Sequence, residues 1–305
     1  MAKRIDMFGI DPENDFLASG NEPADWPWPA GKPCRGALCV EGADKEALLV
    51  EEMIDRLADQ HVPGGHKITN MRITIDSHPL NDCSHNTSWR KPDGTSPDPF
   101  TIVSHDDVKK QLYVPCFPVG KFNGKQVSSY QWALDYTEAL AKNGRAPLCL
   151  WPRHCLIGTW GQNIYHPIRR ALDRWCEVTG RWVDYVVKGQ YPFSEHYSAM
   201  RADVEDPTEP ITQLNVSLLN QANQADIIAW FGWAGSHCLR YTALDAVNYF
   251  GAGENGFIKK CVFFEDACAA VGDLPGVKFS EWRKEFLDEV VKRGATVTTT
   301  KDFLK

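Results

Sequence analysis

The chain alternates short apolar runs with segments of helical periodicity from one end to the other. Parallel strands need a crossover connection that is usually a helix, so this alternation is typical of βαβ units. It predicts an α/β fold with a mainly parallel central sheet. We expect strands at residues 5–10, 71–75, 182–187, 227–233, 261–264 and 295–299, with shorter candidates at 112–114 and 148–150. We expect helices at residues 45–58, 131–143, 167–178, 211–221, 238–250 and 281–293.

Two stretches break this alternation. Residues 17–42 are rich in proline and glycine, and residues 85–147 combine a polar, proline-containing start with later apolar pieces. We interpret both as insertions on a single domain that spans residues 1–305. Each insertion begins shortly after residues that are identified below as candidates for a functional site, and the first insertion contains Trp26 and Trp28. We therefore expect the insertions to cover a pocket or to form a subunit contact.

The composition excludes several classes of protein. Apolar residues make up 43% of the 305 residues and charged residues 24%, which suffices for an ordinary globular core. The 33 Lys and Arg against 40 Asp and Glu give a net charge of −7, and no basic block occurs. Such a chain has no electrostatic footprint for phosphate backbones, so we expect no nucleic-acid partner.

Nothing in the sequence indicates export or a membrane. Asp6 comes too early for the apolar core of a signal peptide, and no apolar run approaches the ~18 residues of a transmembrane helix. The ten cysteines include no Cys-x2-Cys pair and favour reduced thiols over disulfides or structural zinc. We therefore expect a cytoplasmic protein with no membrane partner.

Polar and reactive side chains follow four of the expected strands. Asp11 follows the first strand, Asp76 and His78 the second, Lys188 the third, and Cys238 comes shortly after the fourth. In an open parallel sheet, ligands bind beyond the carboxyl ends of the strands, where the loops converge. The sequence therefore predicts one site at this edge of the sheet.

Cys238 is the candidate nucleophile. It stands at the expected start of a helix, where free backbone amides and the helix dipole favour a thiolate and can hold an oxyanion. Because a free thiol with a pKa of ~8.5 is mostly protonated at neutral pH, it needs a base and a cation. Asp11 and Lys188 are the candidates. Taken alone, a cysteine is more often a small buried apolar residue, and a lysine after a strand is usually solvated.

Asp76 and His78 suggest a metal site. Residues i and i+2 of an extended segment point the same way, so both side chains can face one ion. His154 is our choice for a third ligand, and this donor set suits a divalent transition metal, Zn before Fe or Mn. His85 is a further possibility, but an outer position or no role is favoured for it. Each histidine alone is more often a hydrogen-bonded loop residue.

Five spaced motifs together resemble the isochorismatase-like cysteine hydrolases. Within that superfamily the chain looks most like the nicotinamidases. The motifs span about half of the chain in the same order. They are Asn14-Asp15-Phe16 after Asp11, Asp76-x-His78-Pro79, Trp-Pro-Arg-His-Cys at 151–155, Lys188-Gly189, and Gly232-x-Ala234 before His237-Cys238.

The resemblance implies a three-layer α/β/α fold and an assignment for each site residue. It implies a catalytic triad of Cys238, Asp11 and Lys188 and a metal bound by Asp76, His78 and His154. It also implies an oxyanion hole from the Ala234 and Cys238 amides, with a cis bond before Ala234, and an aromatic slot from Phe16 and Trp151. Ordinary packing is the alternative for the two aromatic residues. Glu13 stands where the family commonly has Gln, and Gly235-Ser236 replaces Thr and an acidic residue.

The activity that the resemblance implies is hydrolysis of nicotinamide to nicotinate and ammonia through a thioester on Cys238. The partner is then a small-molecule amide, and the resemblance leaves a homo-oligomer possible. Another small-amide or ureido hydrolase of the same superfamily is the first alternative. A catalytically inactive binding protein is the second, but such a protein is expected to have lost Cys238, Asp11 or Lys188.

Overall fold

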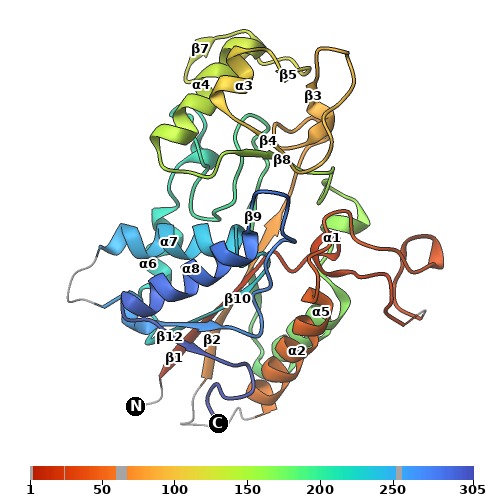
Figure 1. Cartoon of the computed structure of the whole chain (residues 1–305). Coiled ribbons are helices and arrows are strands. Elements are labelled where there is room, and N and C mark those ends of the chain that lie inside the picture. The colour runs from red at the N-terminus through yellow and green to blue at the C-terminus, as the bar shows by residue number, and fades with distance from the viewer. Residues whose placement is uncertain (1–2, 24, 60–66, 252–255) are drawn as a thin grey trace.

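The computed structural model describes residues 3–23, 25–59, 67–251 and 256–305. Its centre is a six-stranded sheet in the order β12-β11-β10-β1-β2-β9, with every neighbouring pair parallel (Figure 1). All six longer strands expected from the sequence are present. They are β1 Arg4–Ile10, β2 Lys67–Asp76, β9 Val183–Lys188, β10 Ile227–Gly232, β11 Cys261–Phe264 and β12 Thr296–Thr298.

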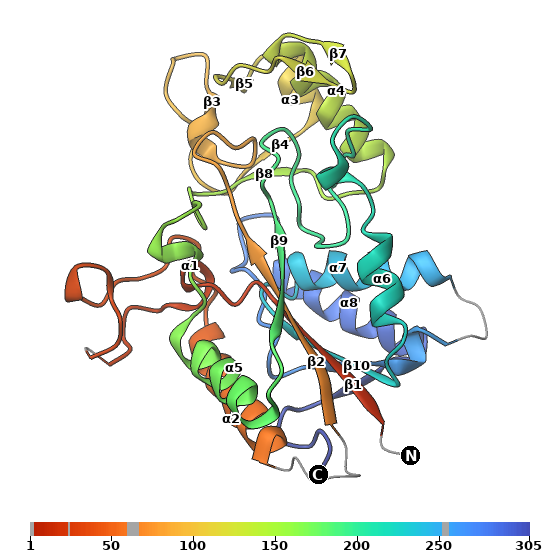
Figure 2. The same ribbon diagram turned by 180° about the vertical axis from the view of Figure 1, so that it is seen from behind.

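Helices cover both faces of this sheet. Figures 1 and 2 show helices on both faces of the sheet, which confirms the predicted three-layer α/β/α architecture. One layer contains α2 Ala43–Asp59 and α5 His166–Thr179, and the opposite layer contains α6 Val216–Ala222, α7 Cys238–Phe250 and α8 Phe279–Lys292. Shorter elements are α1 Asn14–Leu17 and the 3-10 turns Trp160–Gln162, Pro210–Thr212 and Ile258–Lys260.

The central strands bring the candidate site residues to one edge of the sheet. β1 is buried along residues 5–10 because both faces of the parallel sheet are covered by helices. The registers of its neighbours then align the strand ends, since Ile10 lies beside Gly232 and Asp76 lies beside Lys188. The residues that follow or end these strands therefore share one edge.

Two sequence predictions are wrong in detail. The helix expected at 211–221 begins only at Val216, because the side chain of Asn215 accepts a hydrogen bond from Leu218 N at 3.0 Å and so caps the helix there. Ile211 instead lies in a 3-10 turn. The strand expected at 112–114 is reduced to β5, Val114–Pro115.

The second insertion lies beyond the carboxyl ends of the central strands (Figure 1) and packs with Tyr191 and Val204 in a hydrophobic cluster separate from the main core. Trp89, Trp132 and Tyr136 are completely buried in this cluster. The segment reaches the main body through β4, which pairs with β8 next to the site. Its elements and the adjoining strand are the 3-10 turn Asn86–Ser88, β3 Trp89–Arg90, β4 Thr101–Val103, α3 His105–Lys109, β5, β6 Lys121–Phe122, β7 Lys125–Gln126, α4 Ser129–Lys142 and β8 Leu148–Leu150.

The first insertion has two parts with different surroundings. Trp26 packs on Tyr165 and His166 at the start of α5, with ring centroids 5.5 and 5.2 Å apart, and Trp28 packs on Trp160 at 5.8 Å. A 3-10 turn, Pro29–Gly31, follows. The later part of the insertion, around residues 38–40, lines the candidate site. No helix in the described part of the chain is long and apolar enough to cross a membrane.

Candidate active site

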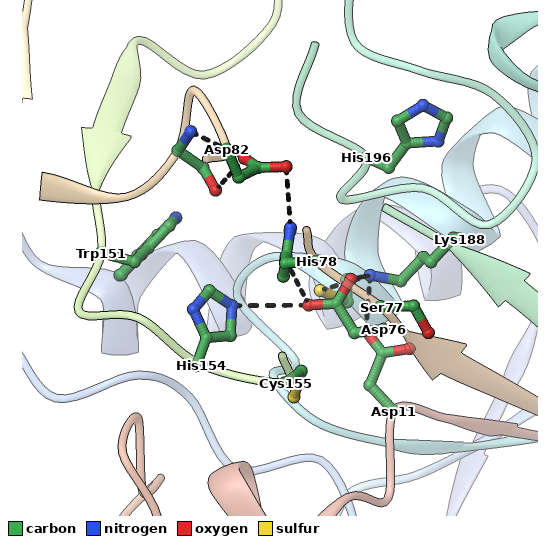
Figure 3. A network of polar contacts seen from close by, with 12 residues as sticks. Asp11, Asp76, Ser77, His78, Asp82, Trp151, His154, Cys155, Lys188 and His196 are labelled. Carbon is green, nitrogen blue, oxygen red and sulfur yellow. Dashed lines mark hydrogen bonds and ion pairs between the residues drawn. The ribbon is translucent and has the colours of Figure 1, made fainter. Parts of the chain in front are cut away.

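The three residues predicted to form a triad lie together at the carboxyl edge of the sheet. Lys188 Nζ is 2.9 Å from Asp11 Oδ2 and donates a hydrogen bond to Cys238 Sγ at 3.7 Å. Figure 3 shows Lys188 between Asp11 and a second carboxylate, that of Asp76, also 2.9 Å away. All four side chains are buried. The edge therefore combines a thiol, a carboxylate and a cation without intervening solvent.

The thiol is protonated in the resting site. Burial raises the pKa of Cys238 well above its usual value, and Asp11 and Asp76 raise it further while Lys188 opposes them. Lys188 lowers the pKa of the thiol, as expected from the sequence, but burial raises that pKa by more, so Cys238 needs a base before it can attack. The nucleophile has to lose its proton as it reacts.

Asp11 is held in position by Thr74. Its backbone amide donates to Thr74 Oγ1 at 2.9 Å, and the same hydroxyl donates back to Asp11 Oδ1. The backbone of Asp11 has a φ of +48°, which turns the chain sharply at the end of β1. Burial raises the pKa of Asp11 above the ordinary carboxyl value, and the Lys188 ammonium limits that rise. Thr74, inside β2, carries no sequence signal of this role.

Lys188 remains a cation in spite of its burial. Burial lowers its pKa, but Asp11 and Asp76 outweigh that effect and hold the pKa of Lys188 well above its usual value. The ammonium group thus stabilises negative charge on both Asp11 and Asp76.

The predicted metal ligands also lie together. Asp76 Oδ2 is 2.9 Å from His78 Nε2 and 3.4 Å from His154 Nε2 (Figure 3). His85 joins them, because its ligand atom and those of His78 and His154 all lie within 4.8 Å of one another. The structure therefore places His85 next to two of the predicted ligands, where the sequence favoured an outer position or no role.

The chemistry of this cluster fits a divalent transition metal. Both ring nitrogens of His85 are buried without a hydrogen-bond partner among the described residues, and burial lowers the pKa of His85 to about 2, so the ring is neutral. A buried neutral imidazole with no protein partner is a good ligand for a metal ion. Three imidazoles and one carboxylate form a donor set that zinc, iron or manganese accepts.

Two further groups orient the histidines. Asp82 Oδ2 is 3.2 Å from His78 Nδ1, and its other oxygen accepts from Ser84 N at 2.9 Å. The carbonyl oxygen of Pro152 is 2.9 Å from His154 Nδ1. Such contacts fix the tautomer of a metal-binding histidine. Sequence reasoning missed Asp82, although a carboxylate four residues after His78 was a signal to weigh.

A small cavity opens onto Cys238. Its empty space, including the open solvent at its mouth, is about 370 Å³. Phe16 and Trp151 stand in its wall as predicted, and Leu38 and Val40 of the first insertion add apolar surface. The remaining lining residues are Asp76, His154, Lys188, Glu195, Tyr197, Ala234, His237 and Val271.

The polar parts of the cavity wall come from several segments. The peptide bond between Trp233 and Ala234 is cis, as the resemblance implied. Trp151 Nε1 donates to Tyr197 Oη at 3.1 Å, which fixes the indole plane. Glu195 is a carboxyl group that sequence reasoning missed, and burial raises its pKa to about 7.

Glu13 departs from the family pattern and lies behind the site. Its Oε1 accepts the backbone amide of Asp76, while Oε2 has no hydrogen-bond partner among the described residues. Burial, together with Asp11 and Asp76, raises the pKa of Glu13 well above the ordinary value. These effects favour the protonated form of the side chain, which is the form closest to the glutamine expected at this position.

Comparison with known proteins places this architecture. No protein-family model and no curated protein sequence matches the chain. Among solved structures, the nicotinamidase/pyrazinamidase of Acinetobacter baumanii aligns over 100% of this chain and 99% of its own, with 19% identity and a TM-score of 0.57. The yeast nicotinamidase Pnc1p aligns over 96% and 99%, with 16% identity and a TM-score of 0.57.

A third match is an isochorismatase-like hydrolase from Alkaliphilus metalliredigens, with 12% identity, a TM-score of 0.50, and coverage of 99% of this chain and 97% of its own. The chain therefore has the isochorismatase-like hydrolase fold. The nicotinamidases named above share that fold with it over nearly their whole length.

Proposed function

We propose that the chain is a metal-dependent cysteine amidohydrolase that converts nicotinamide into nicotinate and ammonia. The observation that carries the proposal is the contact of Lys188 Nζ with Asp11 at 2.9 Å and with Cys238 Sγ at 3.7 Å, at the floor of a small aromatic cavity. A protonated thiol, a base and a cation in this arrangement fit covalent attack on an uncharged amide.

In the first half of the reaction, Asp11 takes the thiol proton while Cys238 Sγ attacks the carboxamide carbon. The developing oxyanion is held by the backbone amides of Ala234 and Cys238, at the start of α7. The C–N bond then breaks, and the leaving nitrogen receives the proton from Asp11. Ammonia departs and a thioester remains on Cys238.

In the second half, Asp11 takes a proton from water, and the water oxygen attacks the thioester carbon. The C–S bond breaks, the sulfur regains a proton and nicotinate is released. Lys188 lies next to both Asp11 and Cys238, so it stabilises whichever of them carries negative charge.

The proposed metal site orients the pyridine ring of the substrate. Asp76, His78, His85 and His154 would hold a divalent transition metal such as Zn, which would supply an electron-pair acceptor for the pyridine nitrogen. Phe16 and Trp151 contribute aromatic surface for the ring. The solved structures add support, since the yeast nicotinamidase Pnc1p binds the inhibitor nicotinaldehyde (16% identity, TM-score 0.58) and PnC1 of L. infantum binds nicotinate (19% identity, TM-score 0.52).

The direct test is ammonia release from a panel of small amides. The panel contains nicotinamide, pyrazinamide, benzamide, which lacks the ring nitrogen, and a linear ureido compound. We expect the highest kcat/KM with nicotinamide, a large loss with benzamide, and loss of activity with a chelator that added metal restores. Preference for the ureido compound would refute the assigned substrate, and no activity on any of them would refute the enzyme class.

A further inference from the structure

A carboxylate outside the cavity is bonded to the loop that carries the Ala234 amide. Glu46, in the first turn of α2, accepts the indole Nε1–H of Trp233 and the backbone amide of Ala269, both at Oε2 and both at 2.8 Å. Trp233 is fully buried and directly precedes Ala234. One oxygen therefore joins the loop after β10 to the loop after β11.

Backbone hydrogen bonds join the same two segments on both sides of Ala234. Gly235 N donates to Ala269 O at 2.9 Å, and Gly232 N donates to Ala267 O at 2.9 Å. A Cβ at Gly235 would lie 2.2 Å from Cys268 O, so only glycine allows this approach. Ala234 thus lies between two anchored residues. The indole of Trp233 is bonded to Glu46, and the amide of Gly235 is bonded to Ala269, whose own amide is bonded to Glu46.

A neighbouring cation holds the second loop in place. Arg283 of α8 donates from Nε to Cys268 O at 2.9 Å, immediately before Ala269. The position of Ala269, and through it the position of Gly235, is therefore fixed from α2 and from α8. Neither Glu46 nor Arg283 lines the cavity.

We infer that Glu46 is a positioning residue for the oxyanion hole, which acts by fixing Trp233 and Ala269 so that the Ala234 amide points at the reacting carbonyl oxygen. This inference rests on the proposed cysteine hydrolase function. Loss of an oxyanion donor costs about 10²–10³-fold in kcat, and a donor that is displaced but still present costs less. We expect Glu46→Ala to lower kcat about 10–100-fold and to leave KM within about twofold.

The variants form a cycle. Trp233→Phe removes the indole donor and should give a loss of the same order, and the double variant should lose little more than either single variant because both break one linkage. Glu46→Gln keeps an acceptor oxygen and should recover part of the rate. Glu52→Ala, at an exposed position of the same helix, is the matched control and should keep wild-type kinetics.

A transition-state probe separates positioning from a general structural effect. Pyridine-3-carboxaldehyde reacts with the enzyme thiol: an S–C bond forms, the carbonyl electron pair moves to oxygen, and the thiol proton passes to Asp11. The resulting oxyanion needs the Ala234 amide, whereas bound nicotinate does not. Glu46→Ala should therefore weaken inhibition by the aldehyde about as much as it lowers kcat/KM, and leave the Ki of nicotinate unchanged.

Equal weakening of both inhibitors, or a kcat loss that disappears after normalisation to titrated active-site thiol, would overturn the inference and leave Glu46 with a folding role. Wild-type kinetics for Glu46→Ala would overturn it as well. The failure of the proposed function looks different, because the wild-type enzyme itself would then release no ammonia from nicotinamide.

Discussion

Lys188→Met tests the electrostatic core of the site, because it keeps the length of the side chain and removes the charge. Lys188 makes two buried ion pairs of 2.9 Å. In the variant, Asp76 keeps His78 and His154 as partners, whereas Asp11 loses its ion pair and keeps the hydrogen bond from Thr74. Breaking a buried pair costs about 3–5 kcal/mol. Since Asp76 retains its other partners, we expect the free energy of unfolding to fall by about 3 kcal/mol at neutral pH.

The loss should depend on pH with a definite sign. The raised pKa of Lys188 means that its stabilising contribution is complete below the ordinary lysine pKa of ~10.4 and is lost only as the pH rises through the folded value. In the variant, the pKa of Asp11 rises further, so the native state binds a proton there that the unfolded state does not. Stability of the variant relative to wild type should therefore improve as the pH falls from 8 to 5.

Urea unfolding followed by far-UV circular dichroism at both pH values measures this effect. Lys284→Met, which removes an exposed ion pair with Asp288, is the matched control and should change stability little. The kcat/KM of Lys188→Met should fall about 10²–10⁴-fold, because Asp11 is protonated and cannot act as a base. Activity within tenfold of wild type, or an equal stability loss at both pH values, would contradict this account of Lys188.

Three other perturbations probe separate parts of the site. Cys238→Ala should abolish ammonia release without changing metal content or the far-UV spectrum, and turnover within tenfold of wild type would rule out a covalent thioester. His85→Ala should weaken metal binding by more than about tenfold in elemental analysis, while His105→Ala, in the second insertion, should not; equal metal content in both would remove His85 from the ligand set. The kcat/KM of the wild-type enzyme should fall at acidic pH with a midpoint above ~3.9, since burial raises the pKa of Asp11, and Asp11→Asn should abolish turnover; an unchanged rate in that variant would mean that another group is the base.

The sheet and its catalytic edge could be predicted because both follow from local rules. A strand buried on both faces is a nearly continuous apolar run, and β1 was recognisable for that reason. The rule that ligands bind at the carboxyl ends of parallel strands then placed Asp11, Asp76 and Lys188 together, and the register confirms that Asp76 lies beside Lys188.

His85 could not be placed from the sequence because its loop is held by distant segments. Cys83 N donates to Pro192 O at 3.0 Å, and Trp151 N donates to Ser84 O at 2.7 Å. These long-range backbone contacts turn the chain so that His85 faces His78 and His154. Spacing along the chain carries no information about such contacts.

The charge state of the thiol was unpredictable for a related reason. Helix position and a nearby lysine were visible in the sequence and favoured a thiolate. The pKa of Cys238 depends mainly on burial, and then on the sum of Lys188, Asp11 and Asp76. The sum of these effects depends on the distances between groups that lie far apart in the sequence. The hydrophobic cluster of the second insertion could not be predicted either, because residues 83–150 pack in it with Tyr191 and Val204, which lie further along the chain.

The central claim is that Cys238 forms a thioester with the acyl group of a pyridine carboxamide. Intact-protein mass spectrometry after rapid acid quenching of the enzyme with nicotinamide tests this claim directly. We predict a wild-type mass increase equal to one nicotinoyl group, located on the Cys238 peptide, lost on treatment with hydroxylamine and absent from Cys238→Ala. Ammonia release in steady state with an adduct on a residue other than Cys238, or an equal adduct in Cys238→Ala, would contradict the account.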